Sequence, residues 1–304
     1  MSLKQTRSTW AILIPLLVTF APLVAQPRTM GLMYNDSTKS YNGYTLFAPL
    51  SYNVVYLIDN EGRLVHSWNA PSKPGLSVYL HEDGSLLHSG GRIDILDWDN
   101  HDLWSYNMNG DSVRRSHDLL ALPNGHIISV VWKTKSVADA LAAGRNPALL
   151  DSTGLMSSCV YEVDTSLNQI VWQWDAWDHM VQDFDSTKAN CGVVRDHPEL
   201  IDINYGIGPN GESNFIHFNA VDYNPTLDQV MVSPRIYSEV WVIDHSTTTA
   251  QAAATPAAVT ASAATCSTVG AIPKPIGAGI HSATGSTTST ARTGCRTACP
   301  GRDA

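Results

Sequence analysis

Short apolar runs alternate with turn residues along most of the chain. The clearest case is residues 54–68, where two β-rich runs flank a polar turn at residues 59–62 and the second run ends in Trp68. Alternation with a period of two around an Asp-Gly or Asn-Gly turn predicts a β-hairpin. Related patterns occur at residues 103–110, 160–174 and 240–244, and a companion hairpin pattern occurs at residues 79–87 and 121–128.

The spacing of these repeats predicts an all-β protein, with a β-propeller as the leading architecture. The first two repeats lie about fifty residues apart, the length of a four-stranded propeller blade. Later intervals are longer, which predicts insertions after Trp132 and Trp177. A β-sandwich is the second architecture, since both folds use short strands and regular turns. The Trp and Tyr residues that close each run are expected to pack between blades, and residues 136–143 form the one predicted helix.

The first 25 residues resemble a secretory signal. Lys4 and Arg7 precede an apolar stretch at residues 10–20, and Ala25 offers the small residue that signal peptidase requires. An uncleaved membrane anchor is the alternative, but two prolines interrupt a segment shorter than the roughly 20 residues of a spanning helix. No second hydrophobic segment occurs, so we expect a periplasmic or secreted protein without stable membrane insertion.

The composition changes after residue 245. Residues 246–304 contain no Phe, Trp or Tyr and consist mainly of Ala, Thr, Ser and Gly. Such a segment buries too little apolar surface to offset the entropy of ordering, which predicts disorder. An out-of-frame translation is the other interpretation, because codons compatible with residues 265–275 encode an aromatic, turn-bearing segment in a shifted frame. The expected domains are therefore a signal peptide (1–25), an incomplete propeller (26–245) and a tail (246–304).

Charge and cysteine content restrict the partners. The net charge of −9 argues against a nucleic-acid partner, which would need a basic face. Cys159 and Cys191 could form a disulfide in an oxidising compartment, and none of the cysteine spacings resembles a zinc motif. An acidic loop could hold a hard cation, but it lacks the EF-hand spacing and the closing Glu. Its carboxylates are Asp94, Asp97, Asp99 and Asp102.

Candidate chemistry lies in three motifs. His117-Asp118 precedes His217-Phe218-Asn219 by a hundred residues, and Arg235, in a Ser-Pro-Arg motif, lies eighteen residues after His217. On an extended segment, His217 and Asn219 would point to the same face. Imidazole has a neutral nitrogen available near pH 7, and guanidinium is always charged and can bind two oxyanion oxygens at once.

These motifs, with the Tyr-Asn-Gly-Tyr segment at residues 41–44, resemble the signature of the arylsulfate sulfotransferases. These exported bacterial enzymes move a sulfuryl group between phenols without a nucleotide donor. The resemblance covers roughly residues 31–250. It implies a six-bladed β-propeller, of which this chain would contain roughly four blades. It also implies aryl sulfates and phenols as small-molecule partners and no cofactor or metal, and it leaves a homodimer open.

The resemblance also implies roles for individual residues. His117, His217 and Arg235 would contact the sulfuryl group and protonate the leaving phenolate, while Asn219 would orient the substrate. The family forms a sulfohistidine on a further histidine in a later blade. In this chain only His281 follows His245, and its Ala, Gly and Ser neighbours do not match a propeller strand. The nucleophile is therefore not assigned, and we expect impaired activity.

Two other functions fit parts of the sequence. A secreted β-propeller that acts as a binding or scaffold module would use the same histidines structurally, and Arg235 would pair with Glu239 on the surface. A propeller dehydrogenase with a quinone cofactor fits less well, since its tryptophan docking repeats and calcium signature are not evident. The remaining histidines are interpreted as structural or solvent-facing: His66, His81, His88, His101, His126, His179 and His197.

Overall fold

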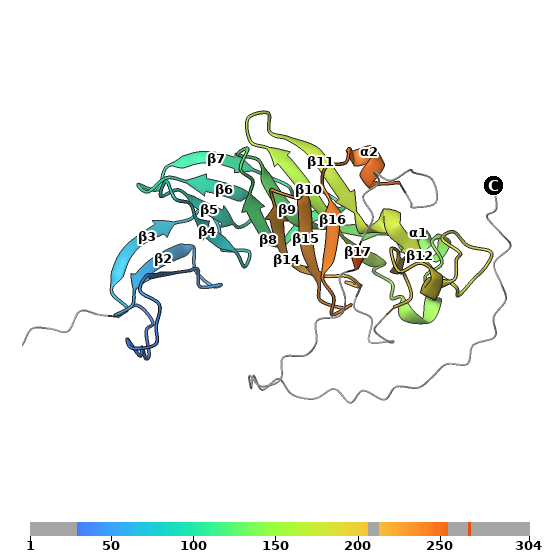
Figure 1. The fold of residues 1–304 in the computed structure, drawn as a ribbon, viewed down its shortest axis with the longest axis horizontal. Coiled ribbons are helices and arrows are strands. Elements are labelled where there is room, and N and C mark those ends of the chain that lie inside the picture. Colours follow the sequence, from blue (N-terminus) through green and yellow to red (C-terminus); the bar gives the residue numbers. More distant parts are fainter. Residues whose placement is uncertain (1–28, 206–212, 255–266, 269–304) are drawn as a thin grey trace, which may run out of the picture.

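The computed structural model describes residues 29–205, 213–254 and 267–268 (Figure 1). The predicted signal peptide and most of the predicted tail, including His281, lie outside these residues. None of the described helices has the length and apolarity that crossing a membrane requires. The helical elements are short: α1 (Val137–Ala142), α2 (Thr249–Ala252), and the 3₁₀ turns η1 (Pro147–Leu149), η2 (Ala176–His179) and η3 (Val194–Asp196).

Most strands form antiparallel sheets whose members follow one another in the chain. The first sheet contains β1 (Tyr44–Phe47), β2 (Val54–Asp59) and β3 (Leu64–Asn69). The second contains β4 (Val78–Leu80), β5 (Leu86–Ser89), β6 (Ile93–Leu96) and β7 (Asp102–Tyr106). The third contains β8 (Val113–Ala121), β9 (Ile127–Lys135), β10 (Leu155–Asp164) and β11 (Gln169–Asp175).

The fourth sheet follows a long excursion of the chain. It contains β14 (Phe218–Asn224), β15 (Gln229–Pro234), β16 (Trp241–Asp244) and β17 (Ser267–Thr268). The excursion between the third and fourth sheets includes the parallel pair β12 (Met180–Val181) and β13 (Ile201–Asp202). Figure 1 shows the blue first sheet at one end, the cyan and green sheets after it, and the orange fourth sheet beside the third.

The local predictions agree with these elements. The patterns at residues 54–68, 79–87 and 121–128 are the β2–β3, β4–β5 and β8–β9 hairpins. Gly84 and Gly125 both adopt a φ of 86° in their turns, a conformation that favours glycine because it lacks a Cβ. The predicted helix at residues 136–143 is α1, which Ser136 begins with a capping box to Asp139. The predicted insertions hold α1 with η1, and η2 through β13.

The core lies between successive sheets. One cluster joins the first and second sheets and includes Trp68, and another joins the second and third. The largest joins the third and fourth and includes Trp174 and Trp241, both almost fully buried. Trp68 and Trp174, which close their runs, pack between sheets as predicted. Sheets stacked in succession, each in contact with its neighbours, are propeller-like and differ from a two-sheet sandwich. The fold is all-β, and the number of blades stays a prediction.

The environment of Cys159 corrects the predicted disulfide. Cys159 is a free thiol buried within β10, so the suggested disulfide with Cys191 is wrong. The Cys159 side chain lies in the core between the second and third sheets.

Beyond residue 245 the described chain continues to residue 254, and the Trp172 indole donates to the carbonyl of Thr247 over 2.9 Å. The first residues of the low-complexity segment therefore pack on β11 through α2.

Candidate active site

Two of the predicted histidines meet although they come from different sheets. The Nε2 atoms of His117 and His217 lie 2.7 Å apart in a hydrogen bond, and the rings stack with centroids 4.7 Å apart. The indole of Trp132 packs edge-on against both rings, at 5.4 Å and 5.8 Å. Because one nitrogen must donate and the other accept, a single proton lies between the rings.

An irregularity in β8 presents His117. The register of β8 against β9 shifts between Arg115 and Leu119, and bulges of this kind re-aim side chains. His117 therefore lies within a bulged strand. The Ser77 hydroxyl donates to the His117 carbonyl over 3.0 Å, which ties this part of β8 to the segment just before β4.

The neighbouring carboxylate of Asp118 joins three strands. One oxygen accepts a hydrogen bond from the Tyr79 hydroxyl of β4 over 2.7 Å, and the other accepts from the Val221 amide of β14 over 3.0 Å. The side chain is buried. Asp118 therefore fixes the mutual position of the strands that carry or adjoin the two histidines.

The backbone at His217 departs from the extended conformation that was expected. Its φ is 61°, a left-handed value that few residues other than glycine adopt and that is often found at functional sites. The Arg235 amide donates to the His217 carbonyl over 2.9 Å, which supports this turn. The prediction that His217 and Asn219 share a face of one extended segment is therefore wrong. Asn219 lies in β14 where the register shifts between Phe218 and Val221.

Arg235 directly follows β15, which ends at Pro234. Its side chain is exposed and forms no ion pair with Glu239 among the described residues; the Glu239 carboxylate instead accepts from the Trp241 indole over 2.7 Å. The alternative of a surface ion pair is thus not formed. Asn219 is likewise exposed. Both side chains are therefore accessible to a ligand.

The electrostatics keep His117 neutral. Burial lowers the pKa of His117, and the positive charges of Arg115 and Arg235 lower it further, while Asp118 opposes them. The guanidinium of Arg115 is anchored by backbone carbonyls and a hydroxyl, those of Gly90, Ser116 and Ser89. A neutral imidazole near two guanidinium groups suits an anionic ligand, because a sulfate ester compensates the positive charge.

Sequence reasoning missed the residues that support the pair. Asn214 places its Nδ2 2.5 Å from Nδ1 of His217. The Trp132 indole packs against the rings of both histidines. The signals were an amide three residues before His217 and a carboxylate directly after His117, neither of which is specific. Two buried polar atoms here have no hydrogen-bond partner among the described residues: Nε1 of Trp132 and Oδ1 of Asn214.

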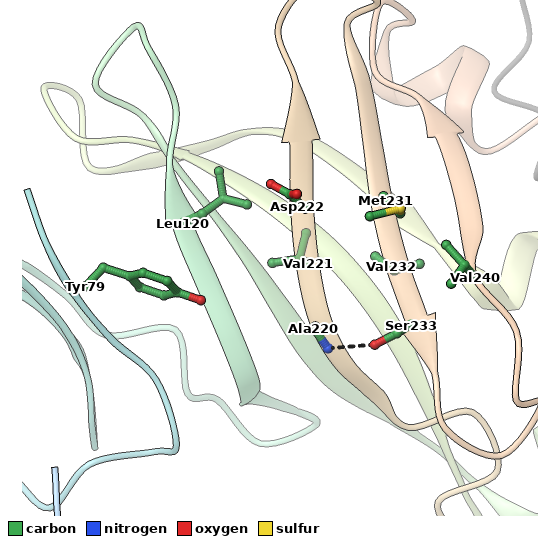
Figure 2. Close-up of a pocket in the computed structure, with 9 residues that line it drawn as sticks. All are labelled: Tyr79, Leu120, Ala220, Val221, Asp222, Met231, Val232, Ser233 and Val240. Atoms are coloured by element: carbon green, nitrogen blue, oxygen red, sulfur yellow. Dashed lines mark hydrogen bonds between the residues drawn. The ribbon is translucent and has the colours of Figure 1, made fainter. Parts of the chain in front are cut away.

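A hollow of about 460 Å³ lies where β14 and β15 meet Tyr79 of β4 and Leu120 of β8. Figure 2 shows Tyr79 and Leu120 on one side of it and Val221, Met231 and Ser233 on the other. The Ala220 amide donates to the Ser233 hydroxyl over 3.1 Å, the dashed line in Figure 2. The hollow therefore begins next to Asn219 in one strand and close to Arg235 in the other.

The other candidates lie elsewhere. Asp94 is buried and pairs with Arg92, and Asp97 pairs with His101. In the part of the chain that the structure describes, no group of His, Cys, Asp or Glu side chains is arranged to hold a metal ion. The remaining histidines have structural or surface surroundings, as with His179, which is buried against Trp174.

Similarity to solved structures is distant. A hydrazine synthase of Kuenenia stuttgartiensis is 13% identical, with a TM-score of 0.41 and coverage of 68% of this chain and 53% of that one. A luciferin-regenerating enzyme is 10% identical, with a TM-score of 0.31 and coverage of 67% and 55%. Kluyveromyces lactis Hsv2 is 10% identical, with a TM-score of 0.30 and coverage of 68% and 60%. The chain thus spans somewhat more than half the length of these proteins.

A family relationship is much clearer. No curated protein matches the chain. The family model described as Arylsulfotransferase (ASST) matches residues 35–253, which include both histidines of the pair, Asn219 and Arg235. This match extends over most of the chain and agrees with the motifs and the all-β fold. The chain therefore belongs to the arylsulfotransferase (ASST) family.

Proposed function

We propose that this protein binds an aryl sulfate with its sulfuryl group at His117, His217 and Arg235, while Asn219 orients the ester. The observation that carries the proposal is the contact of 2.7 Å between histidines of two sheets. The strained backbone of His217 and the hydrogen bond from Arg235 to it support the same assignment. An exported location belongs to the proposal and rests on the pattern of residues 1–25.

The proposed chemistry resembles phosphoryl transfer. Three sulfuryl oxygens carry charge that fixed cations must meet, and the nucleophile and leaving group lie in line. The bond between sulfur and the aryl oxygen breaks, and its electron pair leaves with that oxygen, which takes a proton from an imidazolium. A second phenol later accepts the sulfuryl group. Arg235 supplies the charge, and the negative ester raises the tendency of His117 to take up the required proton.

The intermediate of the proposed reaction is a sulfohistidine, in which sulfur bonds to an imidazole nitrogen. We do not assign that nucleophile to either member of the pair. His281 lies outside the described residues and in a segment without strand patterning. We therefore propose that the chain retains binding and oxyanion stabilisation but turns over slowly.

The hollow that begins next to Asn219 suits the aryl ring of the substrate. Leu120, Val221 and Met231 give it an apolar lining, and aryl groups gain free energy when they leave water for such surroundings. An aryl ring in the hollow would place its sulfate toward Asn219 and Arg235.

Replacing Arg235 tests the proposal. We expect Arg235→Ala to weaken the binding of 4-nitrophenyl sulfate by about tenfold to a hundredfold, because a hydrogen bond to a charged group contributes roughly 1.5–3 kcal/mol. Calorimetric titration measures the dissociation constant. Arg195→Ala is the matched control, since Arg195 is exposed and pairs with its neighbour Asp196. Equal binding by Arg235→Ala and the parent protein would contradict the assignment.

A binding module without catalysis is the second candidate. One observation supports it. Of the described histidines, His117 and His217 are placed at the site, and both are assigned to oxyanion contact and proton transfer. No described histidine is therefore assigned as the nucleophile. Production of 4-nitrophenolate in the presence of a phenolic acceptor discriminates the two functions. Saturable binding without any product supports the binding module, whereas product that disappears in His217→Gln supports the transferase.

A further inference from the structure

We propose that Asn214 is a positioning residue that decides which ring nitrogens of the histidine pair carry protons. Its amide donates to Nδ1 of His217, so that Nε2–H of His217 donates to Nε2 of His117. His117 then carries its own proton on Nδ1. The importance of this arrangement for sulfuryl transfer rests on the proposed function, but the arrangement itself is tested without any substrate.

The position of Asn214 is well defined. It forms a parallel bridge with Met156, the second residue of β10, and the Met156 amide donates to the carbonyl of Ser213 over 2.5 Å. Its Nδ2 lies 2.5 Å from Nδ1 of His217. Its Oδ1 is buried and has no hydrogen-bond partner among the described residues. The side chain is therefore held at the ring by its backbone.

The direction of this hydrogen bond determines the protonation of both rings. An amide N–H at Nδ1 requires a lone pair there, which leaves the proton of neutral His217 on Nε2. The short contact between the two Nε2 atoms then makes His117 the acceptor. If the amide were rotated so that its oxygen faced Nδ1, the proton order of the pair would reverse, because Nδ1 would have to donate.

The arrangement also resists a further proton while the site is empty. His217 has no free lone pair for one, and only one proton fits between the two Nε2 atoms. The described charged groups around the pair are mainly cationic: Arg114 near Trp132, Arg115 of β8, and Arg235 after β15, opposed by Asp118. A sulfuryl group that separates the rings would free Nε2 of His117, which could then be protonated and donate to the leaving oxygen.

Ring protonation is measured directly in protein labelled with ¹⁵N-histidine. Long-range proton–nitrogen correlation spectra show which nitrogens carry hydrogen, and His117→Gln and His217→Gln assign the signals. In the parent protein we expect Nε2–H for His217 and Nδ1–H for His117. Asn214→Asp offers an acceptor in place of the donor, so it should move the proton of His217 to Nδ1. It should also raise the titration midpoint of the pair by at least about one pH unit.

The matched control is Asn224→Asp, which adds the same charge to the far end of β14. The Asn224 oxygen accepts two backbone amides of its own turn, so an aspartate can replace it, and the histidine spectrum should not change. A parent spectrum with Nδ1–H on His217 would overturn the proposal, even if Asn214→Asp fails to fold. A protein that shows the expected protonation but binds no aryl sulfate would refute the proposed function and leave this inference standing.

Discussion

Single residues hold the candidate site together through contacts that cross between sheets. Asp118 is the best example, because its carboxylate accepts hydrogen bonds from Tyr79 and Val221 of two neighbouring sheets. It is buried, so water cannot replace either partner at low cost. The role of Asp118 is thus to position, while the adjacent His117 faces the partner histidine.

Removal of this carboxylate should cost stability. Asp118→Ala leaves the Tyr79 hydroxyl and the Val221 amide without their acceptor, and we expect a loss of about 3 kcal/mol in the free energy of unfolding. Urea unfolding followed by tryptophan fluorescence measures it. Asp99→Ala, at an exposed turn position, should change stability by no more than about 0.5 kcal/mol. Similar losses in the two variants would show that the contacts of Asp118 contribute little.

The sequence allowed part of this site to be predicted. The motifs singled out His117 and His217, and the structure places the two side by side although a hundred residues separate them. The left-handed backbone of His217 could not be predicted, because the surrounding residue pattern is typical of an extended strand. Asn214 and Trp132 were missed for a different reason. Their significance depends on which strands lie side by side, and that is a property of the fold.

At the scale of elements, a chain of ionisable groups joins the third and fourth sheets. Glu162 of β10 accepts from His126 at 2.7 Å and faces His245 at 3.0 Å. His245, just after β16, also contacts Asp228 of the β14–β15 turn at 2.7 Å. Burial alone would lower the pKa of His245, but the hydrogen bonds to Glu162 and Asp228 outweigh it and raise the pKa.

This junction predicts a pH dependence of stability. Because the folded protein raises the pKa of His245, its contribution is fully present below the unfolded value of about 6.5 and is lost as the pH rises through the folded value. We expect the stability difference between the parent and His245→Gln to shrink between pH 6 and pH 8.5. Urea unfolding at both pH values measures this difference. A difference that stays constant would mean that His245 does not act through its charge.

Hairpins and their turns were predictable because period-two patterns and Gly turns are local signals. The register shifts in β8 and β14 were not, since they depend on how a strand pairs with its neighbours. The suggested disulfide between Cys159 and Cys191 was wrong because it, too, depended on how the strands pair in space. Residue spacing allowed Cys159 to meet Cys191, whereas β10 directs the Cys159 thiol into the core between two sheets.

At the scale of the whole molecule, stability depends on the surfaces where successive sheets meet. Trp241 of β16 packs in the largest of them, with ring centroids 5.7 Å from Phe218 and 5.2 Å from Tyr237. The order of sheets follows the order of the chain, which is why repeat spacing in the sequence could predict the architecture. The count of blades could not be established in this way, because the insertions make the spacing irregular.

Truncation of this tryptophan should weaken the whole fourth sheet. We expect Trp241→Ala to lose about 3–5 kcal/mol in the free energy of unfolding, as for other large buried side chains. Trp98→Ala is the control, because Trp98 is 41% exposed, and it should lose clearly less. Thermal unfolding of both variants provides the comparison. Equal losses would show that the interface between the third and fourth sheets is not a main source of stability.

The histidine pair has a further consequence because one ring belongs to the third sheet and the other precedes the fourth. The geometry that would meet a sulfuryl group exists only while these two sheets are packed together. The affinity for an aryl sulfate therefore depends on that packing. A change that moves the fourth sheet away from the third would break the contact between His117 and His217 without altering a residue of the site. The contact between the two imidazoles therefore forms only when the third and fourth sheets pack together, and its presence reports that packing.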